Sequence, residues 1–119
     1  MYVTPTISGS RSGAIISGTW AALLKQGKSG FLEKARTLLT AARKIREEIK
    51  RTVPELYLTS DDDTICVGFS SKVVNCVALV DLMKSRHRWT LNTIQYPLSA
   101  HLVMTDANAS HWKEFVPAL

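Results

Sequence analysis

A long helix-forming stretch between two breaking residues constrains the fold of this chain more than any other feature. It follows Gly27, where we expect the preceding helix to be capped, and it ends before Pro54, which cannot continue a helix. Ser29 is placed to cap its first turn, so we predict a helix from Ser29 to about Thr52. Apolar residues recur in it at alternating four- and three-residue spacing, which puts them on one face: Phe31, Ala35, Leu38, Ala42, Ile45 and Ile49.

The rest of this predicted helix is basic. Long cationic side chains normally keep their charged ends in water, so we expect this surface to be solvated: Arg36, Arg43, Lys44 and Arg46. The chain has a formal net charge of +5, but the excess lies largely on this helix, and no aromatic residues alternate with the basic ones. Single-strand nucleic-acid binders need such aromatic residues, so we expect no nucleic-acid partner.

A segment rich in Ser and Gly, with one Arg, opens the chain and leads into a shorter predicted helix at residues 14–26. Glycines let the backbone approach a ligand closely, and the first amides of a helix point outward with a partial positive charge. Ser10 and Arg11 add a hydroxyl and a planar guanidinium. These groups together suit a phosphate, although a loop that only caps the next helix would have the same composition.

The hydrophobic period changes from helix to strand at Leu56. Residues 56–59 and 64–69 are predicted strands joined by the polar turn at residues 60–63, and residues 89–94 and 100–105 are two more. We therefore predict an α+β fold, with a mainly antiparallel sheet covered by helices on one side.

Two further helices are predicted within this strand-rich part. One runs from about Lys72 to His87, is capped by Ser70 or Ser71, and should bury Val73, Val77, Val80 and Met83. A short helical stretch near the end of the chain carries Trp112 and Phe115.

The reactive side chains form no recognisable catalytic or metal-binding motif. The three histidines lack the spacing and carboxylate companions of a zinc site, and the adjacent aspartates at 61–63 fit a polar turn better than a calcium loop. No nucleophile elbow surrounds Ser10, which argues against a hydrolase. Cys66 and Cys76 are ten positions apart and are expected to be buried thiols. No apolar run is long enough to span a bilayer, so we expect the segment to be soluble.

The chain resembles the sphingosine-1-phosphate lyase family, a group of pyridoxal-phosphate enzymes within the group II decarboxylases. Members carry Ser-Pro-Thr-Ile-Ala-Gly-Ser-Arg-Pro-Gly, then Trp-Ala-Ala-Leu in a helix and Gly-x-x-Gly-Tyr. The matching residues here are Pro5, Thr6, Ile7, Gly9, Ser10, Arg11, Gly13, Trp20, Ala21, Ala22, Leu23, Gly27 and Gly30. A second match includes Trp89, Leu91, Asn92, Gln95, Pro97, Ser99 and His101. The chain departs from the family pattern at Thr4, Ser8, Ser12 and Leu98.

The resemblance implies a cofactor site. Gly9 and Ser10 would bind the phosphate of pyridoxal 5'-phosphate, and Thr6, Arg11 and His101 are candidates for a substrate or structural role. The implied reaction is a retro-aldol cleavage that gives a long-chain aldehyde and phosphoethanolamine. In the family, the lysine that forms the Schiff base lies upstream of the Gly-Ser-Arg stretch, so no catalytic residue is expected here and the isolated chain should be inactive.

The resemblance also implies how the chain is organised. Residues 1–28 would hold the cofactor-phosphate loop and an interdomain helix, and residues 29–119 the small carboxy-terminal α+β domain of a fold-type I enzyme, preceded by a long linking helix. Implied partners are the large domain of the same enzyme, a second copy in a homodimer, and a phosphorylated sphingoid base as substrate. The implied location is the cytosolic side of the endoplasmic reticulum membrane in a eukaryote, or the cytoplasm in a bacterium.

Two other functions remain open. An amino-acid decarboxylase of the same fold shares a Ser-Arg-Pro-like stretch before the same helix, and would release carbon dioxide instead of phosphoethanolamine. A non-catalytic phosphate-binding or dimerisation module could keep the fold and the Ser/Gly/Arg loop without the enzyme.

Overall fold

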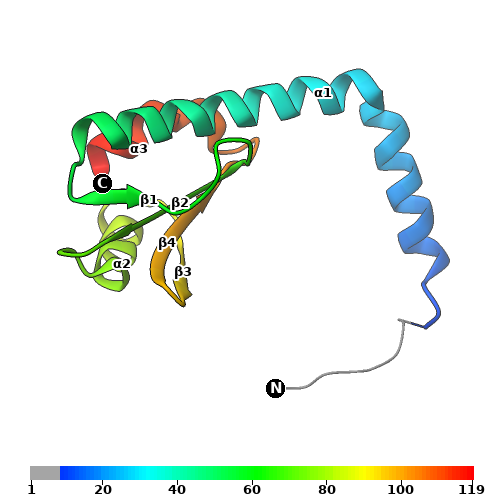
Figure 1. The fold of residues 1–119 in the computed structure, drawn as a ribbon. Helices are drawn as coiled ribbons and strands as arrows, with labels where there is room; N and C mark the ends of the chain where they lie inside the picture. The colour runs from blue at the N-terminus through cyan, green and yellow to red at the C-terminus, as the bar shows by residue number, and fades with distance from the viewer. Residues whose placement is uncertain (1–8) are drawn as a thin grey trace. The chain divides into compact units, whose positions relative to one another are not determined.

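The computed structural model describes residues 9–119, which fold into helices and one sheet (Figure 1). The chain divides into two compact units, Met1–Leu32 and Glu33–Leu119. In order, the elements are α1 (Gly13–Thr52), β1 (Leu56–Leu58), β2 (Cys66–Ser71), α2 (Cys76–His87), β3 (Asn92–Gln95), β4 (Leu98–Val103), a 3-10 turn η1 (Ala109–His111) and α3 (Trp112–Ala118).

Gly27 interrupts α1 where the sequence predicts one helix to end and another to begin. Its backbone has φ of +62° and ψ of 172°, a combination that residues with a Cβ rarely adopt. The predicted break is therefore confirmed. Ser29, expected as the cap of the second helix, lies within α1 instead.

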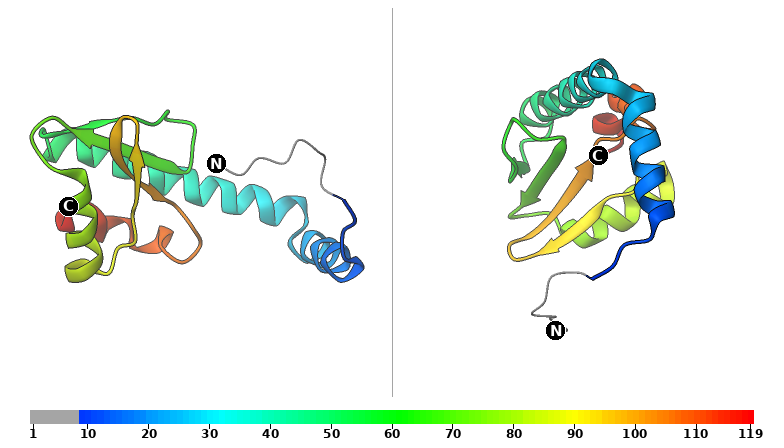
Figure 2. Two further views of the ribbon diagram at one scale, coloured as in Figure 1. Left: turned by 90° about the horizontal axis from the view of Figure 1, so that it is seen from below. Right: turned by 90° about the vertical axis from the view of Figure 1, so that its right-hand side faces the viewer.

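The second unit is an α+β layer, which confirms the predicted fold class. Its four strands are all antiparallel, in the order β1-β2-β4-β3. The helices of this unit gather on one face of the sheet (Figure 2). Apolar side chains from that face of the sheet and from the helices form one core, which includes Ala42, Ile45, Ile49, Val67, Phe69, Met83, Leu102 and Phe115.

The buried face of α1 is shorter than the periodicity predicts. Ala42, Ile45 and Ile49 are buried as expected, whereas Phe31 and Ala35 are exposed. Phe31 belongs to the first unit. The core of the second unit begins on α1 only at Leu38 and Ala41, so Ala35 lies outside it.

α2 begins four residues later than predicted. The Ser71 hydroxyl accepts hydrogen bonds from the amides of Val73 and Val74, at 3.1 and 3.0 Å, which holds these residues in a turn. The cap is Asn75, whose side-chain oxygen accepts from the amides of Val77 and Ala78. Val73 is consequently outside the helix and 77% exposed, and Val77 is also exposed. The prediction that these two valines are buried is therefore wrong, whereas Met83 is buried as predicted.

The third strand is also shifted toward the carboxy terminus. Arg88 ends α2 in the left-handed conformation, and the Trp89 amide bonds back to the Met83 carbonyl. Trp89 therefore packs edge-on against Phe115, with ring centroids 5.1 Å apart, and pairing begins only at Asn92.

Candidate functional site

The predicted phosphate-binding residues precede α1 directly. Gly9, Ser10 and Arg11 are all exposed, and a Cβ added to Gly9 would meet no atom within 4 Å. Arg11 makes no ion pair within residues 9–119. Its guanidinium, the Ser10 hydroxyl and the open backbone of Gly9 thus lie within three consecutive residues.

The first turn of α1 adds backbone amide donors to this segment. The Ser12 carbonyl accepts the amides of Ile15 and Ile16, at 3.1 and 3.2 Å. No acceptor within residues 9–119 binds the amides of Gly13 and Ala14. Amides at a helix start are aligned with the positive end of the helix dipole, so a phosphate fits the groups present here.

The other predicted site residues are Thr6 and His101. Thr6 is outside the described residues. His101 is in β4, in the second unit, whereas Gly9 to Arg11 are in the first. His101 pairs in register with Gly68 on one side and Asn92 on the other. Because Val67 and Phe69 point into the core, Gly68 and His101 lie on the face of the sheet away from the helices.

The surroundings of His101 are tight and polar. Its ring is half-buried, and no residue in 9–119 offers a hydrogen-bond partner to its buried Nδ1 atom. Beside it, a Cβ added to Gly68 would come within 2.8 Å of Thr59 Oγ1. The Gly68 amide donates to Ser60 Oγ at 2.9 Å. A histidine whose buried nitrogen has no partner here has the capacity to bind a polar group from outside the segment.

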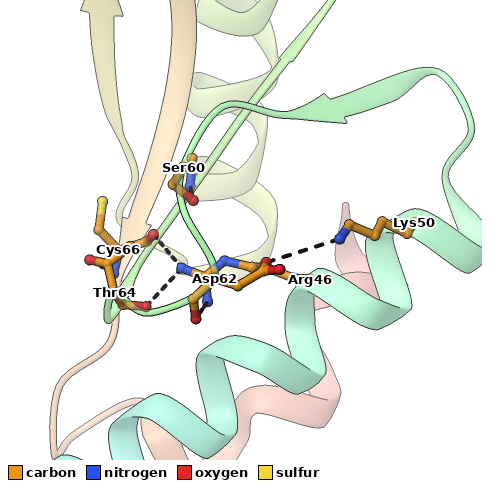
Figure 3. A network of polar contacts seen from close by, with 7 residues as sticks. Arg46, Lys50, Ser60, Asp62, Thr64 and Cys66 are labelled. Carbon is orange, nitrogen blue, oxygen red and sulfur yellow. Dashed lines mark hydrogen bonds and ion pairs between the residues drawn. The ribbon is translucent and has the colours of Figure 1, made fainter.

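Arg46 corrects the prediction of a fully solvated basic face. It is 1% exposed, and its guanidinium donates to the backbone carbonyls of Asp62, Thr64 and Cys66, at 3.3, 2.7 and 2.8 Å (Figure 3). The connection between β1 and β2 folds over this edge of α1, which is why spacing within the helix could not reveal the burial. Arg46 therefore fixes a loop and makes no ion pair within the described residues.

The adjacent aspartates serve the same loop. The Asp63 carboxylate pairs with Arg43 at 2.7 Å, and the Asp62 carboxylate lies 4.0 Å from Lys50. In residues 9–119 no group of His, Cys, Asp and Glu is arranged to hold a metal ion. A polar turn at these positions agrees with the prediction.

Both cysteines are free thiols. Cys76 is buried, whereas Cys66 is half-buried, so the expectation of two buried thiols is met only by Cys76. Partial burial raises the pKa of the Cys66 thiol above its ordinary value, and the nearby positive charge of Arg46 opposes that rise. Cys66 is therefore a weak nucleophile at neutral pH.

One cavity was not foreseen from the sequence. It has a volume of about 620 Å³ and lies where the end of α1 meets α3, lined among others by Arg51, Val53, Trp112, Lys113 and Val116. Residues far apart in the chain form it, so no local motif marks it. It contains none of the predicted site residues.

The comparisons with known proteins agree on one family. Over 105 residues the chain is 35% identical to a sphingosine-1-phosphate lyase of Arabidopsis thaliana, a match that covers 88% of this chain and 19% of the relative. Over 119 residues it is 34% identical to the enzyme of that name from Oryza sativa, covering all of this chain and 22% of the relative. No family model matches the chain.

A solved structure gives the same result for the fold. The structure of a sphingosine-1-phosphate lyase from Burkholderia pseudomallei matches 98% of this chain with a TM-score of 0.77 and 30% identity. That match covers 27% of the bacterial chain. The present chain thus spans about a fifth of the length of the curated relatives. No helix among residues 9–119 is long and apolar enough to cross a membrane.

Proposed function

From its resemblance to sphingosine-1-phosphate lyases along nearly all of its length, we propose that this chain is the carboxy-terminal segment of such an enzyme. Because the segment spans only about a fifth of those relatives, the activity belongs to the longer polypeptide. The enzyme works as a homodimer and cleaves a phosphorylated sphingoid base. It resides on the cytosolic side of the endoplasmic reticulum in a eukaryote, or in the cytoplasm of a bacterium.

The role of this segment is to hold the cofactor by its phosphate. Ser10 and the backbone of Gly9 bind the phosphate of pyridoxal 5'-phosphate, together with the amides of Gly13 and Ala14, which have no acceptor within residues 9–119. Arg11 balances its negative charge or that of the substrate. When bound, pyridoxal phosphate supplies the electron sink for carbon–carbon bond cleavage. The open helix start beside a Gly-Ser-Arg segment is the structural observation that supports this role.

Two further residues contribute to substrate binding in the proposal. Thr6, in the family motif, takes a substrate or structural role. His101 uses its Nδ1 atom, which has no partner within residues 9–119, to orient a polar group of the substrate or of the enzyme. The lysine that binds the cofactor belongs to another part of the enzyme, so the isolated segment has no activity.

The reaction products test the proposal. The full-length protein that contains this segment should convert a phosphorylated sphingoid base into a long-chain aldehyde and phosphoethanolamine when pyridoxal phosphate is added. Carbon dioxide release from an amino acid, without phosphoethanolamine, would instead identify a decarboxylase. If neither product forms and an immunoblot finds the native protein near the 13.2 kDa of this chain, it is a non-catalytic module.

The Ser10→Ala variant of the same full-length protein tests the site. Loss of one hydrogen bond to a charged group should raise the dissociation constant of pyridoxal phosphate about tenfold or more, measured by absorption titration. Ser110→Ala, at an exposed serine of η1 in the second unit, is the matched control and should leave that constant unchanged. Equal constants for the two variants would remove Ser10 from the site.

A further inference from the structure

Trp112 lines two hollows of the second unit, where α3 lies beside α1 (Figure 1). The larger is the cavity of about 620 Å³ at the end of α1. The smaller, of about 340 Å³, is lined by Arg36, Ala41 and Ala109 among others. The Trp112 side chain is partly buried against the core, so its position is fixed by packing. Small-molecule sites in proteins have volumes of about 300–1,000 Å³, and the larger cavity falls within that range.

Much of the larger cavity is apolar, and its acidic group is already engaged. Val53, Val116 and Pro117 line it together with Trp112. The Glu48 carboxylate, which also lines it, accepts a hydrogen bond from the Arg51 guanidinium at 2.6 Å. The cavity therefore offers apolar contact to a ligand, and its lining carries no free negative charge.

The cations around Trp112 have no acidic partners. Lys44 Nζ lies 5.0 Å and Lys113 Nζ 5.8 Å from the centroid of the Trp112 ring. Lys113 lines the larger cavity, and Arg36 lines the smaller one. None of these three residues makes an ion pair within residues 9–119. Two ammonium groups near one indole repel each other, and an anion bound beside them would offset that repulsion. The charge around the cavity thus favours a negatively charged ligand.

The recessed position of the apolar groups distinguishes among anions. A membrane surface is bound by apolar side chains that project from a protein, whereas Val116 is 9% exposed and Val53 is half-buried. An inorganic anion would leave the apolar lining in contact with water. A small amphipathic anion fits both features, because its apolar body covers the valines while its head group meets Lys113.

We propose that the cavity between the end of α1 and α3 binds a small amphipathic anion, an apolar chain or ring that carries a carboxylate or phosphate head. The Lys113 ammonium binds the head group, and the charge of Lys44 adds to the attraction. Trp112 packs against the apolar body. All of these groups belong to the second unit, so the inference does not depend on the function proposed for the Gly-Ser-Arg segment.

Photoaffinity labelling of the full-length protein tests the site. The probe is dodecanoic acid with a photoreactive diazirine on its chain, used below the concentration at which it forms micelles. Mass spectrometry should find the label on peptides that contain residues 48–53 and 112–117. Unlabelled dodecanoate and dodecyl phosphate should both lower this labelling, and the tighter competitor identifies the preferred head group. Dodecanol keeps the chain without the charge and should compete about tenfold more weakly or worse.

Variants of the lining separate this cavity from other places that bind the probe. Lys113→Gln should raise the probe concentration for half-maximal labelling of these peptides about threefold to tenfold. Lys72→Gln makes the same change in net charge at an exposed lysine outside the cavity and should leave that concentration unchanged. Thr52→Trp places a large side chain at an exposed lining position and should prevent the labelling. If Thr52→Trp fails to fold, Lys113→Gln decides alone.

Three results would overturn the proposal. The first is that neither peptide is labelled in the wild-type protein, or that labelling is the same in Lys113→Gln as in Lys72→Gln. The second is that dodecanol competes as well as dodecanoate, since charge then has no part in binding. The third is labelling that requires vesicles of anionic lipid, which would assign the surface to a membrane.

Discussion

Arg46 places a positive charge among the buried residues of the second unit. Its guanidinium is balanced by the dipoles of backbone carbonyls at Asp62, Thr64 and Cys66, and its Nε atom has no partner among residues 9–119. Burying a cation is costly unless its donors are satisfied, and a planar guanidinium can reach several acceptors at once. Arg46 thereby ties the connection between β1 and β2 to α1.

Removing this guanidinium should destabilise the second unit. Arg46→Met keeps most of the side-chain volume but leaves buried carbonyls without a donor, so the free energy of unfolding should fall by about 2 to 4 kcal/mol. Urea unfolding followed by circular dichroism measures the change. Arg43→Met is the matched control on the same helix, because Arg43 and Asp63 form an exposed pair whose loss should cost about 1 kcal/mol or less. Equal losses in the two variants would contradict the structural role of Arg46.

At the scale of elements, local hydrogen bonds decide where α2 begins. Ser71 holds a turn through the amides of Val73 and Val74, and Asn75 then caps the helix. Serine and asparagine both favour such local bonds, so the sequence around residues 70–75 offers more than one possible helix start.

The cap of α2 gives a prediction at this scale. Asn75→Ala removes the acceptor for the amides of Val77 and Ala78 and should lower the free energy of unfolding by about 1 kcal/mol. Ser85→Ala is the control within the same helix. Ser85 is exposed and its hydroxyl makes a long 3.3 Å bond to the Leu82 carbonyl, so its loss should change stability by about 0.5 kcal/mol or less. Chemical denaturation midpoints that are alike for both variants would exclude Asn75 as the cap.

At the scale of the whole molecule, the two units differ in their ability to fold independently. Every residue of the buried core lies between Ala41 and Val116, within the second unit. The described part of the first unit contains no fully buried residue. A helix without a partner to bury its apolar side is marginally stable in water.

A chain of residues 33–119 should therefore fold without the first unit. It should unfold cooperatively in urea, with near-native helix content by circular dichroism, because it retains the sheet, the helices that cover it and the Arg46 contacts. A chain of residues 1–32 alone should show little helix. Non-cooperative unfolding of residues 33–119 would mean that its core depends on the first unit.

The sequence by itself determined the features that depend on neighbouring residues. Helical spacing predicted α1, the conformational freedom of glycine predicted the break at Gly27, and alternating patterns with polar turns predicted an antiparallel α+β fold. The Gly-Ser-Arg and Trp-x-Leu-Asn motifs indicated a resemblance to the lyases, and the comparisons find the same likeness over nearly all of this chain. The roles of Thr6, Gly9, Ser10, Arg11 and His101 remain predictions, because neither residue spacing nor the packing of residues 9–119 specifies a ligand contact.

Only the tertiary structure decided which polar groups are buried and which apolar residues are exposed. Arg46 is on the edge of a helix face that periodicity assigns to solvent, and it is buried because residues 62–66 fold over it. Val73 belongs to an apolar pattern but is exposed, because Asn75 competes for the helix start. Both outcomes depend on particular contacts and hydrogen bonds, which the spacing of apolar and polar residues along the chain does not specify. Spacing along the chain specifies a face, and packing specifies what covers it.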